Sequence, residues 1–89
     1  MKLNLVGNSY QKFKPTKKDK NIKFIKENNN IYDKNAISVI SIRDDKIKKL
    51  GYIDKNETWL VHKYFNIITI KKINKEENGY WSLLVEFNN

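Results

Sequence analysis

The stretch NNNIYDKNAISV, residues 28–39, changes abruptly from a polar turn into an apolar strand. Asparagine and aspartate are typical of turns because their side chains bind nearby backbone amides. This explains the asparagines but not Tyr32, a large aromatic residue among them. The continuation AISVISI, residues 36–42, is apolar or small throughout. Such a run predicts a strand that is buried on both faces.

Outside this stretch, apolar and polar residues mostly alternate, which is typical of strands with one buried face. Together with residues 36–42, these segments predict about six strands. Asp44-Asp45 marks one turn between them, and Asn78-Gly79 is a strong hairpin signal. The alternating segments are those around Leu3 and Leu5, around Ile22 and Phe24, and at residues 46–53, 67–73 and 80–87.

One segment, NETWLVHKYF at residues 56–65, has a helical period instead. Asn56 is a good N-cap residue, and the apolar side chains that follow fall on one face, at Leu60, Val61, Tyr64 and Phe65. We therefore expect one short amphipathic helix. A single domain over residues 1–89, with six strands and one helix, predicts a mainly β fold. The expected architecture is a small OB-like or SH3-like barrel with the helix covering one end.

The chain is strongly basic, with 18 Lys and Arg residues against 10 Asp and Glu residues and a formal net charge of +8. Five lysines lie in QKFKPTKKDKN, residues 11–21, which predicts a basic surface loop. An excess of positive charge of this size favours a polyanionic partner, with nucleic acid first and an anionic membrane second. The alternative is a merely soluble, lysine-rich surface.

Several classes of site lack the residues they need. There is no cysteine, so disulfides and thiolate metal sites are excluded. His62, the only histidine, is expected on the outer, solvated face of the helix, and the isolated glycines do not form a phosphate-binding loop. We expect no enzymatic activity, no metal and no cofactor. Since no apolar run approaches the roughly 18 residues of a membrane span, we expect a cytoplasmic monomer, nucleoid-associated in a bacterium or nuclear in a eukaryote.

Tyrosines near lysine-rich segments are the remaining signal. Tyr10 follows the first strand, and Tyr32 lies in the asparagine-rich turn. Bases of a single strand stack on aromatic rings while lysines contact the phosphates; the alternative is that each tyrosine fills the core. Asp33 would repel a phosphate but could accept a hydrogen bond from a hydroxyl group. Its alternative role is an Asx turn over the following amides.

Three segments of the chain resemble the HIRAN domain family: LVGNSY (5–10), FIKENNNIYDKNAISV (24–39) and LGYI (50–53). They match its Val-Gly start with a following aromatic, its Asn-x-Tyr-Asp-x-Asn-Ala-Ile-x-Val core and its Gly-Tyr-Ile ending before a helix. The resemblance implies a modified small barrel that grips the 3′ end of single-stranded DNA. Such domains occur in DNA-repair ATPases and alone in some microbial proteins.

The resemblance also implies roles for individual residues. Tyr10 and Tyr32 would flank the terminal bases, Asp33 would accept a hydrogen bond from the 3′-hydroxyl, and Asn30 would line the same pocket. The remaining expected nucleic-acid-binding residues are Tyr52 and, for the phosphates, Lys26, Lys34 and Lys55.

Three positions depart from the family pattern. Ser9 stands where the DNA-end binders carry arginine, Ile31 replaces a proline, and Tyr52 stands where many members have histidine. We therefore expect a non-catalytic module for single-stranded or frayed DNA ends, with any helicase, ATPase or nuclease supplied by another chain. The alternative is a protein-interaction domain that has kept the fold and lost DNA-end binding.

Overall fold

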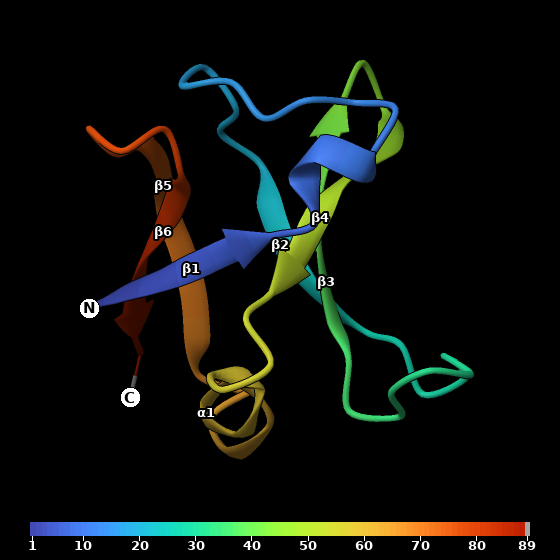
Figure 1. The fold of residues 1–89 in the computed structure, drawn as a ribbon. Coiled ribbons are helices and arrows are strands. Elements are labelled where there is room, and N and C mark those ends of the chain that lie inside the picture. The colour runs from blue at the N-terminus through green and yellow to red at the C-terminus, as the bar shows by residue number, and fades with distance from the viewer. Residues whose placement is uncertain (89) are drawn as a thin grey trace.

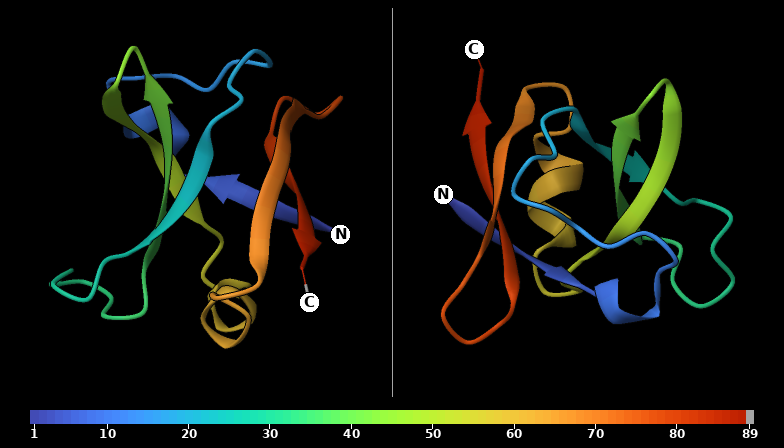
Figure 2. Two further views of the ribbon diagram at one scale, coloured as in Figure 1. Left: turned by 180° about the vertical axis from the view of Figure 1, so that it is seen from behind. Right: turned by 90° about the horizontal axis from the view of Figure 1, so that it is seen from above.

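The computed structural model describes residues 1–88 and is mainly β, as predicted (Figure 1). Its six strands form one antiparallel sheet in the order β2-β3-β4-β1-β6-β5. The sheet curls into an incomplete barrel, and the helix lies at one end (Figures 1 and 2). In chain order the elements are β1 (Lys2–Val6), the 3₁₀ turn η1 (Asn8–Tyr10), β2 (Ile22–Lys26), β3 (Ile37–Arg43), β4 (Lys46–Ile53), α1 (Thr58–Lys63), β5 (Ile68–Lys75) and β6 (Trp81–Phe87).

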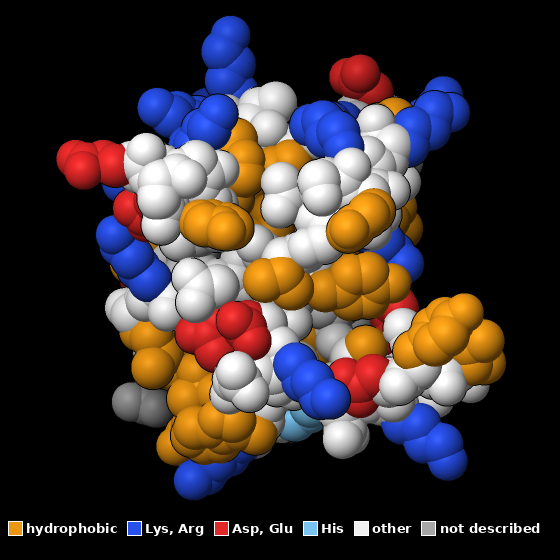
Figure 3. Space-filling view, viewed as in Figure 1, with side chains coloured by type: hydrophobic (Ala, Val, Ile, Leu, Met, Phe, Trp, Pro, Cys, Tyr) orange, Lys and Arg blue, Asp and Glu red, His pale blue; other side chains and the backbone are white. Residues whose placement is uncertain are grey.

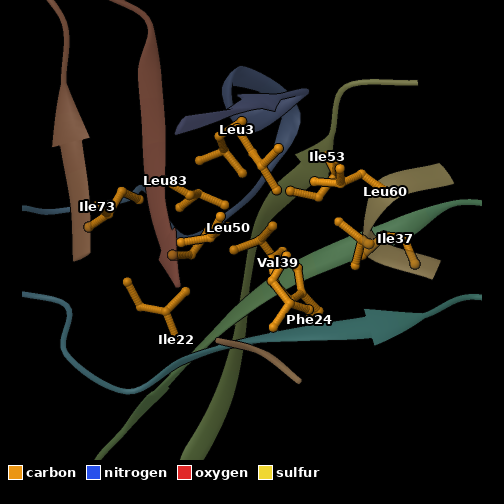
Figure 4. Close-up of a cluster of buried hydrophobic side chains, with 14 residues drawn as sticks. Leu3, Ile22, Phe24, Ile37, Val39, Leu50, Ile53, Leu60, Ile73 and Leu83 are labelled. Atoms are coloured by element: carbon orange, nitrogen blue, oxygen red, sulfur yellow. The ribbon is translucent and has the colours of Figure 1, made fainter. Parts of the chain in front are cut away.

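The core fills the inside of the curled sheet. Figure 4 shows side chains from α1 and from the strands meeting in one cluster, with Leu3, Leu50 and Leu83 near its centre. β3 is buried over five consecutive residues, from Ile37 to Ser41, so the apolar run is a central strand as predicted. At Gly51 a Cβ would lie 2.7 Å from the Val6 carbonyl oxygen, so only glycine lets β4 approach β1 this closely.

Both predicted turns are present. Asp44 and Asp45 have φ angles of 50° and 63°, the left-handed conformation that a two-residue type I′ hairpin turn requires between β3 and β4. Gly79 has a φ of 87° in the β5–β6 hairpin, where the Asn78 side chain accepts a hydrogen bond from the Tyr80 amide. These turns set the register of the two hairpins.

The helix is shorter than predicted, and Asn56 does not cap it. α1 begins at Thr58 and has Glu57 at its N-cap position, without a side-chain capping bond. The cause is an Asx turn in which the Asp54 carboxylate accepts the Asn56 amide hydrogen at 3.0 Å, so that residues 55–57 form a turn. Leu60 and Val61 are buried as expected, so the helix still covers one end of the barrel.

The basic loop at residues 11–21 is fastened to the sheet by its one acidic residue, a contact that the sequence did not suggest. Asp19 is buried, and its two carboxylate oxygens accept hydrogen bonds of 2.7 Å from Nε and Nη2 of Arg43. Burial alone would raise the pKa of Asp19, but the hydrogen bonds from Arg43, Ser41 and Thr16 lower it to about 2. Asp19 therefore fastens the loop to Arg43 on β3, and its bond with the Thr16 amide orders the loop backbone.

Within the described residues, no helix is both long enough and apolar enough to cross a membrane. The same residues contain no cluster of three or more His, Cys, Asp or Glu side chains that could hold a metal ion.

Candidate nucleic-acid interface

A shallow pocket of about 360 Å³ lies where the end of β4, the start of α1 and the 27–36 loop meet. Five of the sequence-predicted site residues line it: Asn30, Tyr32, Asp33, Tyr52 and Lys55. These residues come from positions 30–55, and only the pairing of β3 with β4 brings them together. Val6, Ala36 and Ile53 contribute an apolar floor.

The Asn30 side chain organises the loop. Its Oδ1 accepts hydrogen bonds from the backbone amides of Tyr32 at 2.9 Å and Asp33 at 3.0 Å. Two backbone bonds between Glu27 and Ala36 and between Asp33 and Ala36 close the base of the loop. A proline at position 31 would restrict the backbone of the turn by fixing φ. With Ile31 there, the two bonds to Asn30 Oδ1 restrict the turn in its place. Asn30 therefore both shapes the loop and lines the pocket.

Tyr32 is not a core residue. Its side chain is 92% exposed at the rim of the pocket, and the neighbouring Ile31 is 87% exposed. An aromatic ring held by an ordered loop, with its faces open to solvent, is available for stacking. Packing in the core therefore does not explain why a large aromatic residue occurs in this polar turn, whereas an exposed ring that can stack on a base does.

The Asp33 carboxylate is half-buried, and its two oxygens have different surroundings. Oδ1 accepts the Asn35 amide hydrogen at 2.9 Å, so the Asx turn that was the alternative role of Asp33 is present. Among residues 1–88, no group donates a hydrogen bond to Oδ2. One oxygen therefore fixes the orientation of the side chain, and the second is free to accept a hydrogen bond at the pocket.

A charged network that sequence reasoning missed supports the pocket wall. The Tyr52 hydroxyl donates to Glu27 Oε1 at 3.0 Å and accepts from Lys49 Nζ at 3.1 Å, while Lys49 Nζ lies 2.7 Å from Glu27 Oε2. Asn30 Nδ2 also donates to Glu27 Oε1, at 3.2 Å. The Tyr52 hydroxyl is thus already engaged, and its ring forms the wall.

The network shifts the titration of both charged members. Burial would raise the pKa of Glu27, but hydrogen bonds from Lys49, Asn30 and Tyr52 outweigh it and lower the pKa. The hydrogen bond to Glu27 raises the pKa of Lys49. Glu27 therefore stays ionised and holds the Asn30 amide with its oxygen toward the loop. The only sequence signal was that Glu27 directly follows a strand; no spacing linked it to Lys49 or Tyr52.

The three predicted phosphate-binding lysines occupy different places. Lys55 lines the pocket, and Lys34 is exposed on the loop beside it. Lys26 is not among the lining residues; its Nζ lies 4.3 Å from the centroid of the Phe65 ring. Figure 3 shows further lysine side chains gathered along the upper edge of this face, over the 11–21 loop and the β3–β4 hairpin, with hydrophobic side chains across its middle.

Tyr10 is 90% exposed on η1 and does not line the pocket. In Figures 1 and 2, η1 and the 27–36 loop project from the same face of the barrel, with η1 toward its upper end. Lys14 Nζ donates to the backbone oxygens of Asn8 at 3.2 Å and Ser9 at 2.9 Å, which anchors η1 to the basic loop. The two tyrosines are thus both exposed, but only Tyr32 belongs to the pocket.

His62 is not the freely solvated residue that was expected. It is half-buried, and its Nε2 lies 2.9 Å from the Asn35 carbonyl oxygen. The reason is that Asn35, at the end of the 27–36 loop, lies next to α1 and meets this side chain. His62 therefore links the helix to the loop that carries Tyr32 and Asp33.

In a comparison with protein families, the chain matches the HIRAN domain over residues 1–79 of the 89. Comparison with curated proteins and with solved structures gave no match. The matched region contains β1 to β5, the helix, the 27–36 loop and every residue that lines the pocket. The HIRAN domain is known as a DNA-binding module. Because the match covers most of the chain, this protein belongs to the HIRAN domain family.

Proposed function

We propose that this protein is a non-catalytic module that binds the 3′-hydroxyl end of single-stranded or frayed DNA. The observation that carries the proposal is the pairing of an exposed ring with a carboxylate oxygen that has no donor among residues 1–88. Tyr32 is 92% exposed, and within those residues the Asp33 carboxylate beside it is held through Oδ1 only. Both residues line a pocket large enough for part of a nucleotide, at about 360 Å³.

In this proposal the terminal base stacks on Tyr32, and a base further along the strand stacks on Tyr10. Base–aromatic stacking contributes about 1–3 kcal/mol per base. Neither ring needs to leave the core to do so, since both are about nine-tenths exposed. The hydrogen bonds that the Tyr32 and Asp33 amides donate to Asn30 Oδ1 support the ring in advance, which lowers the entropy lost on binding.

Asp33 distinguishes the strand end from its interior. The free Oδ2 accepts a hydrogen bond from a 3′-hydroxyl, which has a proton to donate. An internal phosphodiester or a terminal phosphate offers the carboxylate only like charge. Lys55, Lys34 and the lysines of the 11–21 loop neutralise the phosphates that precede the end.

One titration tests end recognition separately from general strand binding. A fluorescently labelled linear single strand with a 3′-hydroxyl is compared with a covalently closed circle of the same sequence and length. Both carry the same bases and nearly the same charge, but the circle has no end. We expect the linear strand to bind at least about tenfold more tightly, since a charge-assisted hydrogen bond contributes about 1.5–3 kcal/mol. Equal affinities for the linear strand and the circle would show that the protein binds single strands without recognising their ends.

The exposure of Ile31 favours a second candidate function. Together with Tyr32 it gives the loop an apolar tip, and such tips also suit protein surfaces. A protein-interaction domain without DNA binding would bind neither the linear strand nor the circle. The same titration therefore separates the two functions.

A further inference from the structure

A second pocket, of about 300 Å³, adjoins the one that holds Tyr32 and Asp33. This Trp59 pocket is lined by Asn35, Thr58, Trp59 and His62. Thr58, the first residue of α1, lines both pockets. The Asn35 amide also donates to Asp33 Oδ1. The Trp59 pocket is therefore continuous with the proposed site for the 3′-hydroxyl.

Trp59 gives this pocket an exposed aromatic ring. Its side chain is 60% exposed, although the next two residues of α1, Leu60 and Val61, are buried in the core. Packing therefore does not explain a tryptophan at this position, whereas stacking on a planar ligand does. His62 Nε2 lies 2.9 Å from the Asn35 carbonyl oxygen, so α1 and the 27–36 loop hold the two walls of the pocket together.

The other lining groups suit a nucleobase. Within residues 1–88, the side-chain amide of Asn35 and Nδ1 of His62 form no hydrogen bond, so both are available to the polar edge of a stacked base. No acidic residue lines the pocket. Two exposed lysines flank it in sequence, since Lys34 precedes Asn35 and Lys63 follows Trp59 by one helical turn. Trp59 is its only hydrophobic lining residue, so a peptide side chain would find little apolar surface to cover.

The strand that ends at Asp33 does not fill the Trp59 pocket. Under the proposed function this first strand leaves the Tyr32 pocket toward Tyr10 on η1. η1 borders the wall formed by Tyr52, because a Cβ on the preceding Gly7 would lie 3.6 Å from the Tyr52 ring. Figure 1 shows η1 and α1 toward opposite ends of the barrel. The first strand therefore runs away from α1, and a base on Trp59 belongs to another strand.

We infer, on the basis of the proposed function, that the Trp59 pocket binds an unpaired base of the second strand at a frayed duplex end. Opening the last pair of a duplex unstacks two bases, one on each strand. Tyr32 stacks on the base of the first strand and Trp59 on that of the second, so both regain a stacking partner. The preferred substrate is then a two-stranded end with open terminal pairs.

The test compares two frayed duplexes that share the same first strand, ending in a 3′-hydroxyl. The last few positions are unpaired in both. There the second strand carries ordinary bases in one duplex and abasic residues in the other, so the phosphate charge is the same. Wild type should bind the duplex with ordinary bases about tenfold more tightly by fluorescence anisotropy, because only that duplex offers a base to Trp59.

Variants assign this ratio of affinities to Trp59. Trp59→Ala should bring the ratio close to one, while Trp59→Phe, which keeps an aromatic ring, should retain most of it. Ile47→Ala truncates another exposed hydrophobic residue, on the β3–β4 hairpin, and should leave the ratio unchanged. Tyr32→Ala should weaken binding of both duplexes and keep the ratio, since Tyr32 contacts the first strand.

A 2-aminopurine in the unpaired part of the second strand gives a measurement that needs no variant. Its fluorescence should fall when wild type binds, because stacking on Trp59 quenches it, and unchanged fluorescence would overturn the inference. So would a wild-type ratio near one, or a Trp59→Ala ratio as large as that of wild type. These results would leave end recognition intact if single strands with a 3′-hydroxyl still bound more tightly than those with a 3′-phosphate. Failure to bind either duplex would refute the proposed function and the inference together.

Discussion

Replacing Asp19 by asparagine should destabilise the protein in a way that depends on pH. Asp19 is 7% exposed and receives hydrogen bonds from Arg43, Ser41 and Thr16, and its pKa falls from an ordinary value of 3.8 to about 2. At about 1.36 kcal/mol per pKa unit, a lowering of this size corresponds to about 2 kcal/mol of stability. That is a large part of the roughly 5–15 kcal/mol that stabilises a small domain.

The sign follows from proton linkage. Because the folded-state pKa is depressed, the ionised carboxylate stabilises the fold fully above the unfolded-state pKa of about 3.8. This contribution disappears as pH falls toward about 2, and about half of it remains at pH 3. Asparagine has the shape of the carboxyl group and, like its protonated form, carries no charge. Asp19→Asn should therefore cost about 2 kcal/mol at pH 7, and the difference from wild type should shrink as the solution is acidified.

Urea unfolding followed by tryptophan fluorescence at pH 7, 5 and 3 measures this difference. Asp45→Asn is the matched control, since Asp45 is an exposed carboxylate in a turn where asparagine also tolerates a positive φ. Its effect should stay below about 0.5 kcal/mol at every pH. A destabilisation by Asp19→Asn that is equally large at pH 7 and pH 3 would refute the reasoning, because it would then arise from packing and not from charge.

Three further results are expected. Tyr32→Ala should weaken single-strand binding by about 1–3 kcal/mol with little change in melting temperature, whereas Tyr80→Ala, another exposed tyrosine, should not affect binding; unfolding of Tyr32→Ala would mean that the ring is structural. The logarithm of affinity should fall with the logarithm of salt concentration with a slope of about −2 to −3 for three or four lysine contacts, and a flat response would contradict phosphate binding. Tyr52→Phe removes the hydroxyl that donates to Glu27 and should cost about 1 kcal/mol in thermal or urea unfolding; an unchanged stability would show that the network does not support the pocket wall.

The sequence predicted the strands well because each has a signal of its own. The buried run at residues 36–42, the Asp44-Asp45 turn and the Asn78-Gly79 hairpin are local patterns, and each appears in the structure with small shifts at its ends. The helix start was wrong because two local signals competed at neighbouring positions. Asn56 is a good capping residue, but the Asp54 side chain binds the Asn56 amide first and delays the helix.

The site was predictable in part for the same reason. Tyr32, Asp33 and Asn30 lie in one short motif, so their proximity follows from the loop itself. Glu27 and Lys49 could not be placed because their contact depends on how β2, β3 and β4 align in space. Asp19 likewise looked like one more charge in a basic loop. Only the three-dimensional fold buries it beside Arg43.

The most direct test of end recognition compares one single strand carrying a 3′-hydroxyl with the same strand carrying a 3′-phosphate, for wild type and Asp33→Asn. Asparagine can keep the Asx turn through its own Oδ1, so the variant removes charge at Oδ2 without removing the bond to the Asn35 amide. Asp54→Asn is a matched control, because Asp54 makes the same kind of turn with the Asn56 amide.

We predict that wild type and Asp54→Asn bind the hydroxyl strand at least about tenfold more tightly than the phosphate strand. Asp33→Asn should bring that ratio close to one, since an amide can donate to a phosphate as well as accept from a hydroxyl. The ratio, and not the affinity, is the quantity to measure, because removal of a negative charge strengthens binding to any nucleic acid. A wild-type ratio near one would contradict the account and leave Asp33 as a turn residue.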